Sequence, residues 1–366
     1  MDETVYDQLG TRAVVNARGI YTDLGGAVVS PEVWAAMTDA NARAVEMTPL
    51  LESAGRRIAD ALGVDAAWVT PGASAAIALS TAACMTGRDH LAMERLPDTT
   101  GLRDVVVCQR GHRTRYARMC WMTGARLVEV DPAELDQALD PATVAAVFCP
   151  GHLDGRAGTI SLAAVFALSR ARGVPTIVDA AFLNYPPASM RRFVDLGADL
   201  VCFSAKYYYG PNGGGFVCGR ADLIDAVAGL DFAGFESADY LSFGRPFKLD
   251  RHTVVGTVLA LEEWLTLDHE ARFAEYARRV RTITESLPAG IAGEPMFFTM
   301  EETLIAGPPV NCLVVHPPDA AGAHRALHDG DPPVACHLDG ERLVIAVDAM
   351  APGEEELVAE RLAELG

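Results

Sequence analysis

The sequence predicts an α/β protein, with a large domain built on a mainly parallel seven-stranded sheet and a smaller α+β domain at the C-terminal end. Two observations predict the large domain: short segments that are apolar throughout, and helical segments that separate most of them. Such strands are typical of parallel sheets whose two faces are covered by helices. The third observation is length, because 366 residues suffice for more than one domain.

Two helices come first. Residues 30–44 have Ser30 as the N-cap followed by Pro31, and a second helix runs from Thr48 to about Gly63. The strands predicted for the large domain then follow at 66–70, 104–109, 125–130, 144–149, 174–179, 199–204 and 214–219. Only a loop separates the last two strands, which allows one of the seven to run in the opposite direction.

Helices and a smaller unit complete the chain. Helices between the strands are predicted at 71–87, 161–173 and 189–197, and a long helix is predicted at 251–286. The small unit then has three strands and a last helix, at 311–316, 334–338, 342–347 and 353–365. We therefore divide the chain into an N-terminal arm that reaches the active site or a partner subunit, a large α/β domain and a small α+β domain, at 1–45, 46–250 and 251–366.

Composition narrows the class of protein. The 30 basic and 49 acidic side chains give a net charge of −19, which disfavours nucleic acid as a partner. No segment is long and apolar enough for a membrane span, and the acidic N-terminus lacks the pattern of a secretory signal. The eight cysteines have no metal-binding spacing and favour buried, reduced thiols. We expect a cytoplasmic protein with no metal site and no membrane partner.

The first predicted strand of the sheet is followed by small residues that open a helix. Free backbone N–H groups and the positive end of the helix dipole make such a turn an anion site. Gly72 and Ala73 leave room for a phosphate, and Ser74 can add a hydroxyl group. An ordinary glycine-rich turn is the alternative.

Two further strands end in chemically active residues. Asp179 closes the strand at 174–179, and Ala181 keeps the space beside it open. Lys206 follows the strand at 199–204, after Ser204, and precedes three tyrosines and a glycine-rich turn. A structural lysine would extend its amine to solvent, whereas a partly desolvated one can attack a carbonyl group to form a Schiff base.

Together these parts predict a site for pyridoxal phosphate (PLP). The lysine follows the aspartate by 206 − 179 = 27 residues, and ligands of open parallel sheets bind at the carboxyl ends of the strands. Lys206 would form the Schiff base, and Asp179 would keep the pyridine nitrogen protonated. Gly72, Ala73, Ser74 and Ser204 would hold the phosphate. A stacking residue is also required; His112 and Tyr116 are the candidates, and we favour His112.

These residues lie within a wider pattern. The chain resembles the fold-type-I, aspartate-aminotransferase-like PLP enzymes, and among them the family that groups selenocysteine synthase (seryl-tRNA selenium transferase) with D-glucosaminate-6-phosphate ammonia-lyase. The matching segments are 14–37, 69–87, 105–130, 178–182, 203–219 and 244–265.

The resemblance implies a homodimer or higher homo-oligomer with its sites at subunit interfaces. The glycine cluster 213–215, with Gly214 at its centre, would then face the cofactor phosphate of the neighbouring subunit. It also implies that Thr22 contacts the substrate, and that Arg245 and Lys248 bind an anionic group of it. Structural ion pairs are the alternative for the last two residues.

The chain departs from the family in two places. We expect neither the longer N-terminal domain nor the distinctive N-terminal segment of the selenium transferases in this protein, which disfavours selenocysteine synthesis. The ammonia-lyase-like relatives carry an arginine near the C-terminus, where this chain has Ala349. His337 or Arg342 could bind the substrate carboxylate instead, or the substrate could differ from the usual one.

The predicted function is a PLP-dependent lyase that takes the Cα proton of an amino acid or amino-sugar acid and eliminates a β-substituent. The alternative is β- or γ-replacement or cyclisation in secondary metabolism. Racemisation, aldol cleavage and transamination use the same residues. A non-catalytic PLP-binding protein is disfavoured because Lys206 and Asp179 are both present. A dinucleotide-binding dehydrogenase is also disfavoured, because this sequence lacks the glycine motif of such enzymes.

Overall fold

The computed structural model describes residues 4–237, 240–299 and 302–365. The chain forms two compact units: Val29–Thr266 make up the large unit, and Met1–Val28 with Leu267–Gly366 make up the small one. The sequence-based borders at 45/46 and 250/251 divide the chain by expected role, and they stay a prediction.

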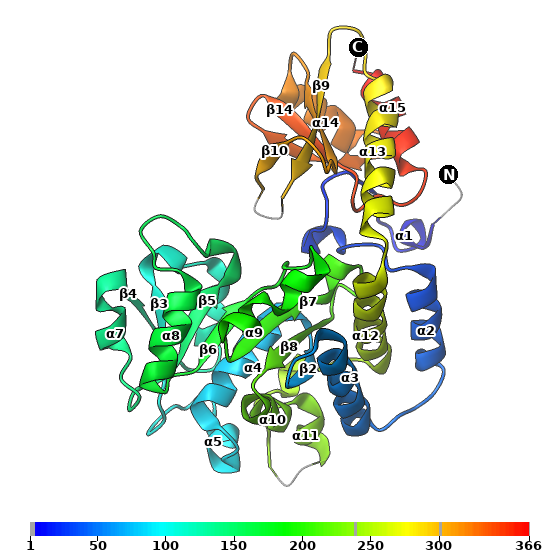
Figure 1. Ribbon diagram of the computed structural model, residues 1–366. Coiled ribbons are helices and arrows are strands. Elements are labelled where there is room, and N and C mark those ends of the chain that lie inside the picture. Colours follow the sequence, from blue (N-terminus) through cyan, green and yellow to red (C-terminus); the bar gives the residue numbers. More distant parts are fainter. Residues whose placement is uncertain (1–3, 238–239, 300–301, 366) are drawn as a thin grey trace. The chain divides into compact units, whose positions relative to one another are not determined.

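The large unit contains the expected seven-stranded sheet (Figure 1). In spatial order its strands are β2 (Ala66–Thr70), β8 (Gly215–Gly219), β7 (Leu200–Ser204), β6 (Thr176–Asp179), β5 (Val144–Pro150), β3 (Val105–Gln109) and β4 (Arg126–Val130). β8 runs antiparallel to both of its neighbours, and all the other pairs are parallel. The mainly parallel sheet is therefore confirmed, and β8 is the one reversed strand.

Helices flank this sheet (Figure 1). They are α2 (Pro31–Asn41), α3 (Met47–Leu62), α4 (Gly72–Thr86), α5 (His90–Arg95), α6 (Arg118–Trp121), α7 (Leu135–Ala138), α8 (Leu162–Arg172), α9 (Arg192–Leu196), α10 (Ala221–Gly229), α11 (Phe232–Ser237) and α12 (Arg251–Thr266). α4 consists mostly of small residues, is buried along nearly its whole length and packs against five strands of the sheet, β2, β5, β6, β7 and β8. Its small side chains allow the close approach that brings its first turn to the ends of the strands.

The small unit is an α+β arrangement, as expected. Its antiparallel sheet has the order β10 (Leu304–Ala306), β9 (Ala292–Phe298), β11 (Cys312–His316), β14 (Arg342–Ala346) and β13 (His337–Asp339). A second ladder pairs β1 (Val15–Asn16) with β12 (Val334–Ala335) in parallel. The helices are α1 (Val5–Gln8), α13 (His269–Glu285), α14 (Ala320–Asp329) and α15 (Glu354–Ala363).

The small unit has elements that were not predicted, among them β9, β10 and α14, and two predicted elements are divided in the structure. The single helix expected over 251–286 is two helices, because the side chain of Asp268 caps a new helix by accepting a hydrogen bond from Ala271 N. The strand expected over 334–338 is interrupted at Cys336, and its two parts pair with different partners. Within the described residues, no helix is both long enough and apolar enough to cross a membrane.

Candidate active site

The sheet brings the predicted site residues to one edge. In the parallel β6–β7 pair, Asp179 lies opposite Cys202, two residues before Ser204. Because β8 is antiparallel, it begins at this same edge, where Gly215 lies opposite both Ser204 and Thr70. The turn after β2, Asp179 and the lysine turn after β7 therefore come from elements that are neighbours in the sheet.

The turn after β2 is built from glycine backbone. Gly72 opens α4 with a φ of +74°, which disfavours any residue with a side chain. A Cβ atom on Gly215 would lie 2.6 Å from the Cα of Gly72, and one on Gly214 would lie 2.2 Å from Oγ1 of Thr257 in α12. Ala73 is buried and Ser74 is exposed at the first turn of this 15-residue helix. The first N–H groups of α4 and the Ser74 hydroxyl suit a phosphate group.

Asp179 is a buried carboxylate that accepts a backbone hydrogen bond. It is 5% exposed, and its Oδ1 accepts a hydrogen bond from Ala181 N at 3.2 Å. Burial raises the pKa of Asp179 to about 6, against the opposing effect of the Ala181 hydrogen bond. Such a carboxylate suits a protonated ring nitrogen, because an adjacent positive charge would offset its desolvation.

Lys206 lies in η7 (Ala205–Tyr208), the turn that follows β7, and is 8% exposed. Its Nζ atom is 4.7 Å from the centre of the Tyr207 ring. Ser204, also buried, donates its backbone N–H to the carbonyl of Ala181 at 3.1 Å, which ties the end of β7 to the segment after Asp179. A buried amine in this position suits covalent attachment of a carbonyl compound.

His112 ends the turn η2 (Arg110–His112) after β3 and is 1% exposed. The Gln109 amide lies 3.2 Å from its Nδ1 and also donates to Ile160 O, while Gln109 Oε1 accepts from Ile160 N. Nδ1 is therefore the acceptor, and Nε2–H donates to Leu153 O at 3.1 Å. Burial lowers the pKa of His112, so the imidazole is neutral. Because both ring nitrogens of His112 are hydrogen-bonded, the faces of the ring remain for contact with a cofactor.

The structure adds an aromatic row that our sequence reasoning missed. The ring of His152 lies 5.3 Å from Phe182, and the ring of Phe182 lies 5.9 Å from Tyr207. Each follows the end of a strand by two or three residues, at β5, β6 and β7. Burial raises the pKa of Tyr207 to about 12, with smaller contributions from Tyr116 and Asp179. That common offset from the strand ends is the one signal in the sequence that could have identified this row.

For the three predicted substrate residues, the structure describes the local surroundings. Arg245, in η8 (Arg245–Phe247), forms an ion pair with Glu236 at 3.0 Å. A structural ion pair is the alternative to substrate binding that the sequence left open. Lys248 is exposed, and Thr22 is an exposed residue of the small unit, in η1 (Thr22–Leu24). Their roles in binding stay predictions.

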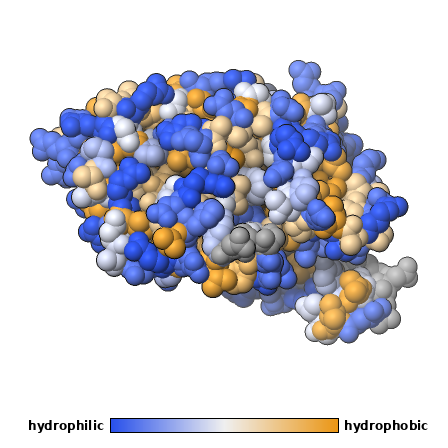
Figure 2. All heavy atoms as spheres, turned by 90° about the horizontal axis from the view of Figure 1, so that it is seen from below, coloured by the Kyte–Doolittle hydropathy of each residue, from blue (hydrophilic) through white to orange (hydrophobic). Residues whose placement is uncertain are grey.

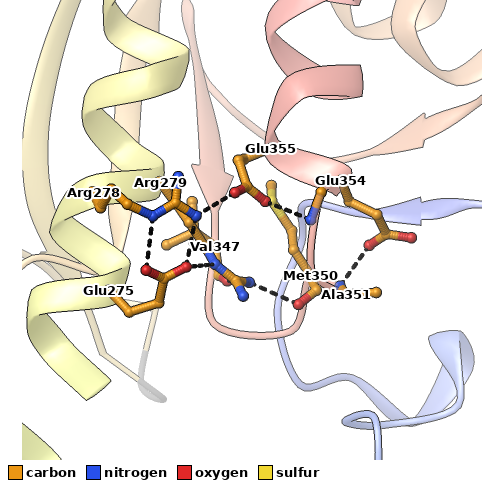
Figure 3. A network of polar contacts seen from close by, with 9 residues as sticks. Glu275, Arg278, Arg279, Val347, Met350, Ala351, Glu354 and Glu355 are labelled. Carbon is orange, nitrogen blue, oxygen red and sulfur yellow. Dashed lines mark hydrogen bonds and ion pairs between the residues drawn. The ribbon is translucent and has the colours of Figure 1, made fainter. Parts of the chain in front are cut away.

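Ala349 lies in the sequence between Val347 and Met350, whose backbone carbonyl groups accept hydrogen bonds from Arg279 (Figure 3). It is 4% exposed. Arg279 of α13 donates to the carbonyl groups of Met350 at 2.8 Å and Val347 at 3.4 Å, while Glu275 pairs with both Arg278 and Arg279. The hydrogen bond from Arg278, with help from Arg279, holds the pKa of Glu275 at about 2. The resemblance implies that the relatives carry an arginine in this loop. In this chain the loop has Ala349 instead, and its carbonyl groups are bound by Arg279 of α13.

A cavity of about 550 Å³ lies elsewhere in the large unit. It is lined by the beginning of β2, including Trp68, and by residues of α3 and α10, and none of the predicted site residues contributes to it. It is therefore separate from the groups described above. Figure 2 shows the molecule from below, a face on which hydrophilic residues surround smaller hydrophobic patches.

Comparison with known proteins agrees with this geometry. The family model described as aminotransferase class-V matches residues 21–304. The chain belongs to this family. The class-V relatives include the 5'-C-glycyluridine monooxygenase-decarboxylase of a Streptomyces species, which is 32% identical over 98% of this chain and 91% of its own. The D-glucosaminate-6-phosphate ammonia lyase of Salmonella typhimurium is 29% identical over 79% of this chain and 76% of its own.

Solved structures extend the likeness to three dimensions. The structure of D-glucosaminate-6-phosphate ammonia-lyase superimposes with a TM-score of 0.86 at 26% identity, over 100% of this chain and 98% of that one. Serine palmitoyltransferase with PLP shares the fold alone, with a TM-score of 0.56 at 16% identity. The resemblance found in the sequence is confirmed: this class-V protein is a fold-type-I, PLP-dependent enzyme of the ammonia-lyase-like group.

Proposed function

We propose that the protein removes the Cα proton of a β-oxygenated amino acid and expels the β-oxygen, as an ammonia-lyase does. The observation that carries the proposal is the placement of buried Lys206 and buried Asp179 at the ends of the adjacent strands β7 and β6. The names of the relatives support the substrate class. Glucosaminate, glycyluridine and the seryl group are all amino acids with an oxygen on the β-carbon.

Each residue then has one task. Bound PLP would withdraw electrons from the Cα atom of the attached substrate. The first turn of α4, with Gly72, Ala73 and Ser74, would bind the phosphate, together with Ser204. Asp179 would keep a proton on the ring nitrogen, with Ala181 donating to its carboxylate. Lys206 would hold the cofactor and, once released by the substrate, would take the Cα proton on its Nζ atom.

The walls of the site would keep water away from this proton. His112 would stack on the ring, and the row formed by His152, Phe182 and Tyr207 would line the space beside Lys206. Because the pKa of Tyr207 is raised, its hydroxyl group stays protonated at neutral pH and can donate a hydrogen bond. A closed site of this kind strengthens every polar interaction inside it.

Decarboxylation is the second candidate. The observation that favours it is the near full-length match, at 32% identity, to a monooxygenase-decarboxylase. Elimination and decarboxylation both begin when a bond to the Cα atom of the substrate breaks. They differ in the group that leaves and in the need for O₂. The buried Ala349, in place of a cationic side chain, also removes one group that would hold a carboxylate.

We also propose a homodimer and a cytoplasmic location. The family resemblance supports the dimer. All eight cysteines are buried and none is in a disulfide bond, which is typical of a reducing compartment. Light scattering of the purified protein tests the dimer.

One experiment separates the candidates. Protein reconstituted with PLP is incubated with D-glucosaminate-6-phosphate, 5'-C-glycyluridine and threonine, with and without O₂, while ammonia, CO₂ and O₂ are measured. Ammonia released without O₂ supports the lyase, and CO₂ formed with O₂ consumption supports the second candidate. Lys206→Ala is the control and should do neither. Absence of both products from all three compounds, in protein that carries PLP, would overturn both proposals.

A further inference from the structure

The turn that carries Lys206 is short and ends in an unfavourable conformation. η7 has four residues, and the next residue, Tyr209, has a φ of +58°. Among the described residues, Tyr209 and Glu302 are the only residues other than glycine with a positive φ. The left-handed conformation is unfavourable for a residue with a side chain. Contacts outside η7 therefore have to hold the turn in place.

Asn184 provides one such contact. Its side-chain amide donates a hydrogen bond to the backbone carbonyl of Tyr207, the residue after Lys206. Only the amide nitrogen can donate to a carbonyl, so this contact also fixes the orientation of the Asn184 side chain. Asn184 follows Asp179 by five residues, 184 − 179 = 5, in the segment that continues from β6.

Asn184 is itself held by α12. The indole N–H of Trp264, a residue 2% exposed, donates to the backbone carbonyl of Asn184 at 2.7 Å. The Trp264 ring also packs edge-on against Tyr209, with 5.5 Å between ring centres. Trp264 thus contacts both the segment after Asp179 and the end of the lysine turn, and Asn184 joins the two.

We propose that Asn184 is a positioning residue that fixes the turn of Lys206 relative to Asp179. The proposal rests on the proposed function, in which Lys206 and Asp179 act on two parts of one rigid cofactor ring. Misplacement of a reacting group by about 1 Å can slow a reaction by about a hundredfold. A side chain that links the two segments directly controls that displacement.

Asn184→Asp and Asn184→Ala test the proposal. Asp keeps the size of the side chain but, when ionised, sets a carboxylate against the Tyr207 carbonyl; Ala removes the contact. The main readout is the pH titration of the visible absorption of the PLP-loaded protein, which reports the environment of the lysine-bound cofactor without turnover. We expect the midpoint to shift by about half a pH unit or more in both variants. We expect kcat to fall about tenfold or more with KM nearly unchanged.

Matched variants separate positioning from general destabilisation. Asn311→Ala is the control, because Asn311 also bonds through its side chain to backbone groups, those of Phe298, but in the small unit. It should lower the unfolding temperature and leave the titration unchanged. Trp264→Phe keeps a ring against Tyr209 and loses the indole donor, so it should shift the midpoint in the same direction by a smaller amount. It also serves as the test if the Asn184 variants do not fold.

The outcomes distinguish this inference from the proposed function. A wild-type absorption band that borohydride bleaches, with cofactor fixed at Lys206, establishes the site. If the variants then titrate and turn over like the wild type, the positioning role is overturned and the proposed function stands. A wild-type protein without such a band overturns the proposed function itself.

Discussion

Gly215 and Gly72 are in direct backbone contact: a Cβ atom on Gly215 would lie 2.6 Å from the Cα of Gly72 and 2.5 Å from the carbonyl oxygen of Phe203. These neighbours are main-chain atoms, which cannot turn aside as a side chain can. The start of α4 and the start of β8 therefore form one tightly packed surface, and the proposed phosphate site depends on it.

We expect Gly215→Ala to weaken PLP binding about tenfold or more, since forcing the two backbones apart by the width of a methyl group costs about 1–3 kcal/mol. Titration of the cofactor-free protein with PLP, followed by absorption, measures the dissociation constant. Gly234→Ala is the control, because a Cβ atom there meets its neighbours at 3.8 Å or more. Equal affinities in the two variants would contradict a phosphate site at this contact.

Asp179→Asn tests the partner of the ring nitrogen. The substitution keeps the shape of a side chain that is 5% exposed and removes its charge. We expect the variant to retain PLP, because the phosphate site and Lys206 are intact, and to lose about a hundredfold or more in kcat, since the ring nitrogen would no longer be held protonated. Borohydride reduction followed by mass spectrometry measures retention, and product formation measures kcat. Full activity in this variant would rule out the assigned role.

Asp231 makes the stability of the protein depend on pH. Burial raises the pKa of this carboxyl group from 3.8 to about 6, although Trp68 donates a hydrogen bond to it at 2.9 Å. The folded protein therefore binds the proton more tightly than the unfolded chain, and the group destabilises the fold as pH rises from about 4 to above 6. Relative to Asp231→Asn, the wild type should lose up to about 3 kcal/mol of unfolding free energy over that range.

Urea unfolding at several pH values measures this difference. Trp68→Phe removes the donor, so the loss should extend to higher pH. If the difference in unfolding free energy between the wild type and Asp231→Asn does not change with pH, then Asp231 titrates alike in the folded and unfolded states.

Ala349→Arg tests whether the arginine of the relatives can simply be restored. Position 349 is 4% exposed, and the loop around it is fixed by Arg279. We expect a buried, unpaired guanidinium to destabilise the protein by a few kcal/mol without improving KM. Urea unfolding and steady-state kinetics measure both effects, with the exposed Ala321→Arg as the control. A lower KM with unchanged stability would show that the side chain reaches the substrate.

The order of the chemistry along the chain was accessible from the sequence, because strand ends are local features. Asp179 and Lys206 each follow an apolar run, and the loop-only connection before residue 214 allowed one reversed strand, which is β8 in the structure. The break between α12 and α13 was missed, since Asp268 had to be recognised as a helix cap within an apolar pattern that continues through it.

The contacts that support the site were not accessible in the same way. Asn184 bonds to Tyr207 and receives Trp264 from a helix 80 residues further along, and nothing in its local sequence indicates either partner. For Arg245 the sequence left substrate binding and a structural ion pair both open, and Glu236 had to be placed in space to reveal the ion pair. Packing across the fold decides such pairs, and a pattern of residue types does not encode it.

The pairing of β2 with β8 has a consequence for the folding of the chain. Thr70 and Gly215 are partners although 215 − 70 = 145 residues separate them. Contacts so distant in the sequence form late, because a long loop must close before they stabilise anything. During synthesis, β2 therefore stays without its neighbouring strand until β8 has left the ribosome. The proposed phosphate site, which needs the contact between Gly72 and Gly215, would therefore be completed late in the maturation of the protein, and a chain truncated before residue 215 would lack it.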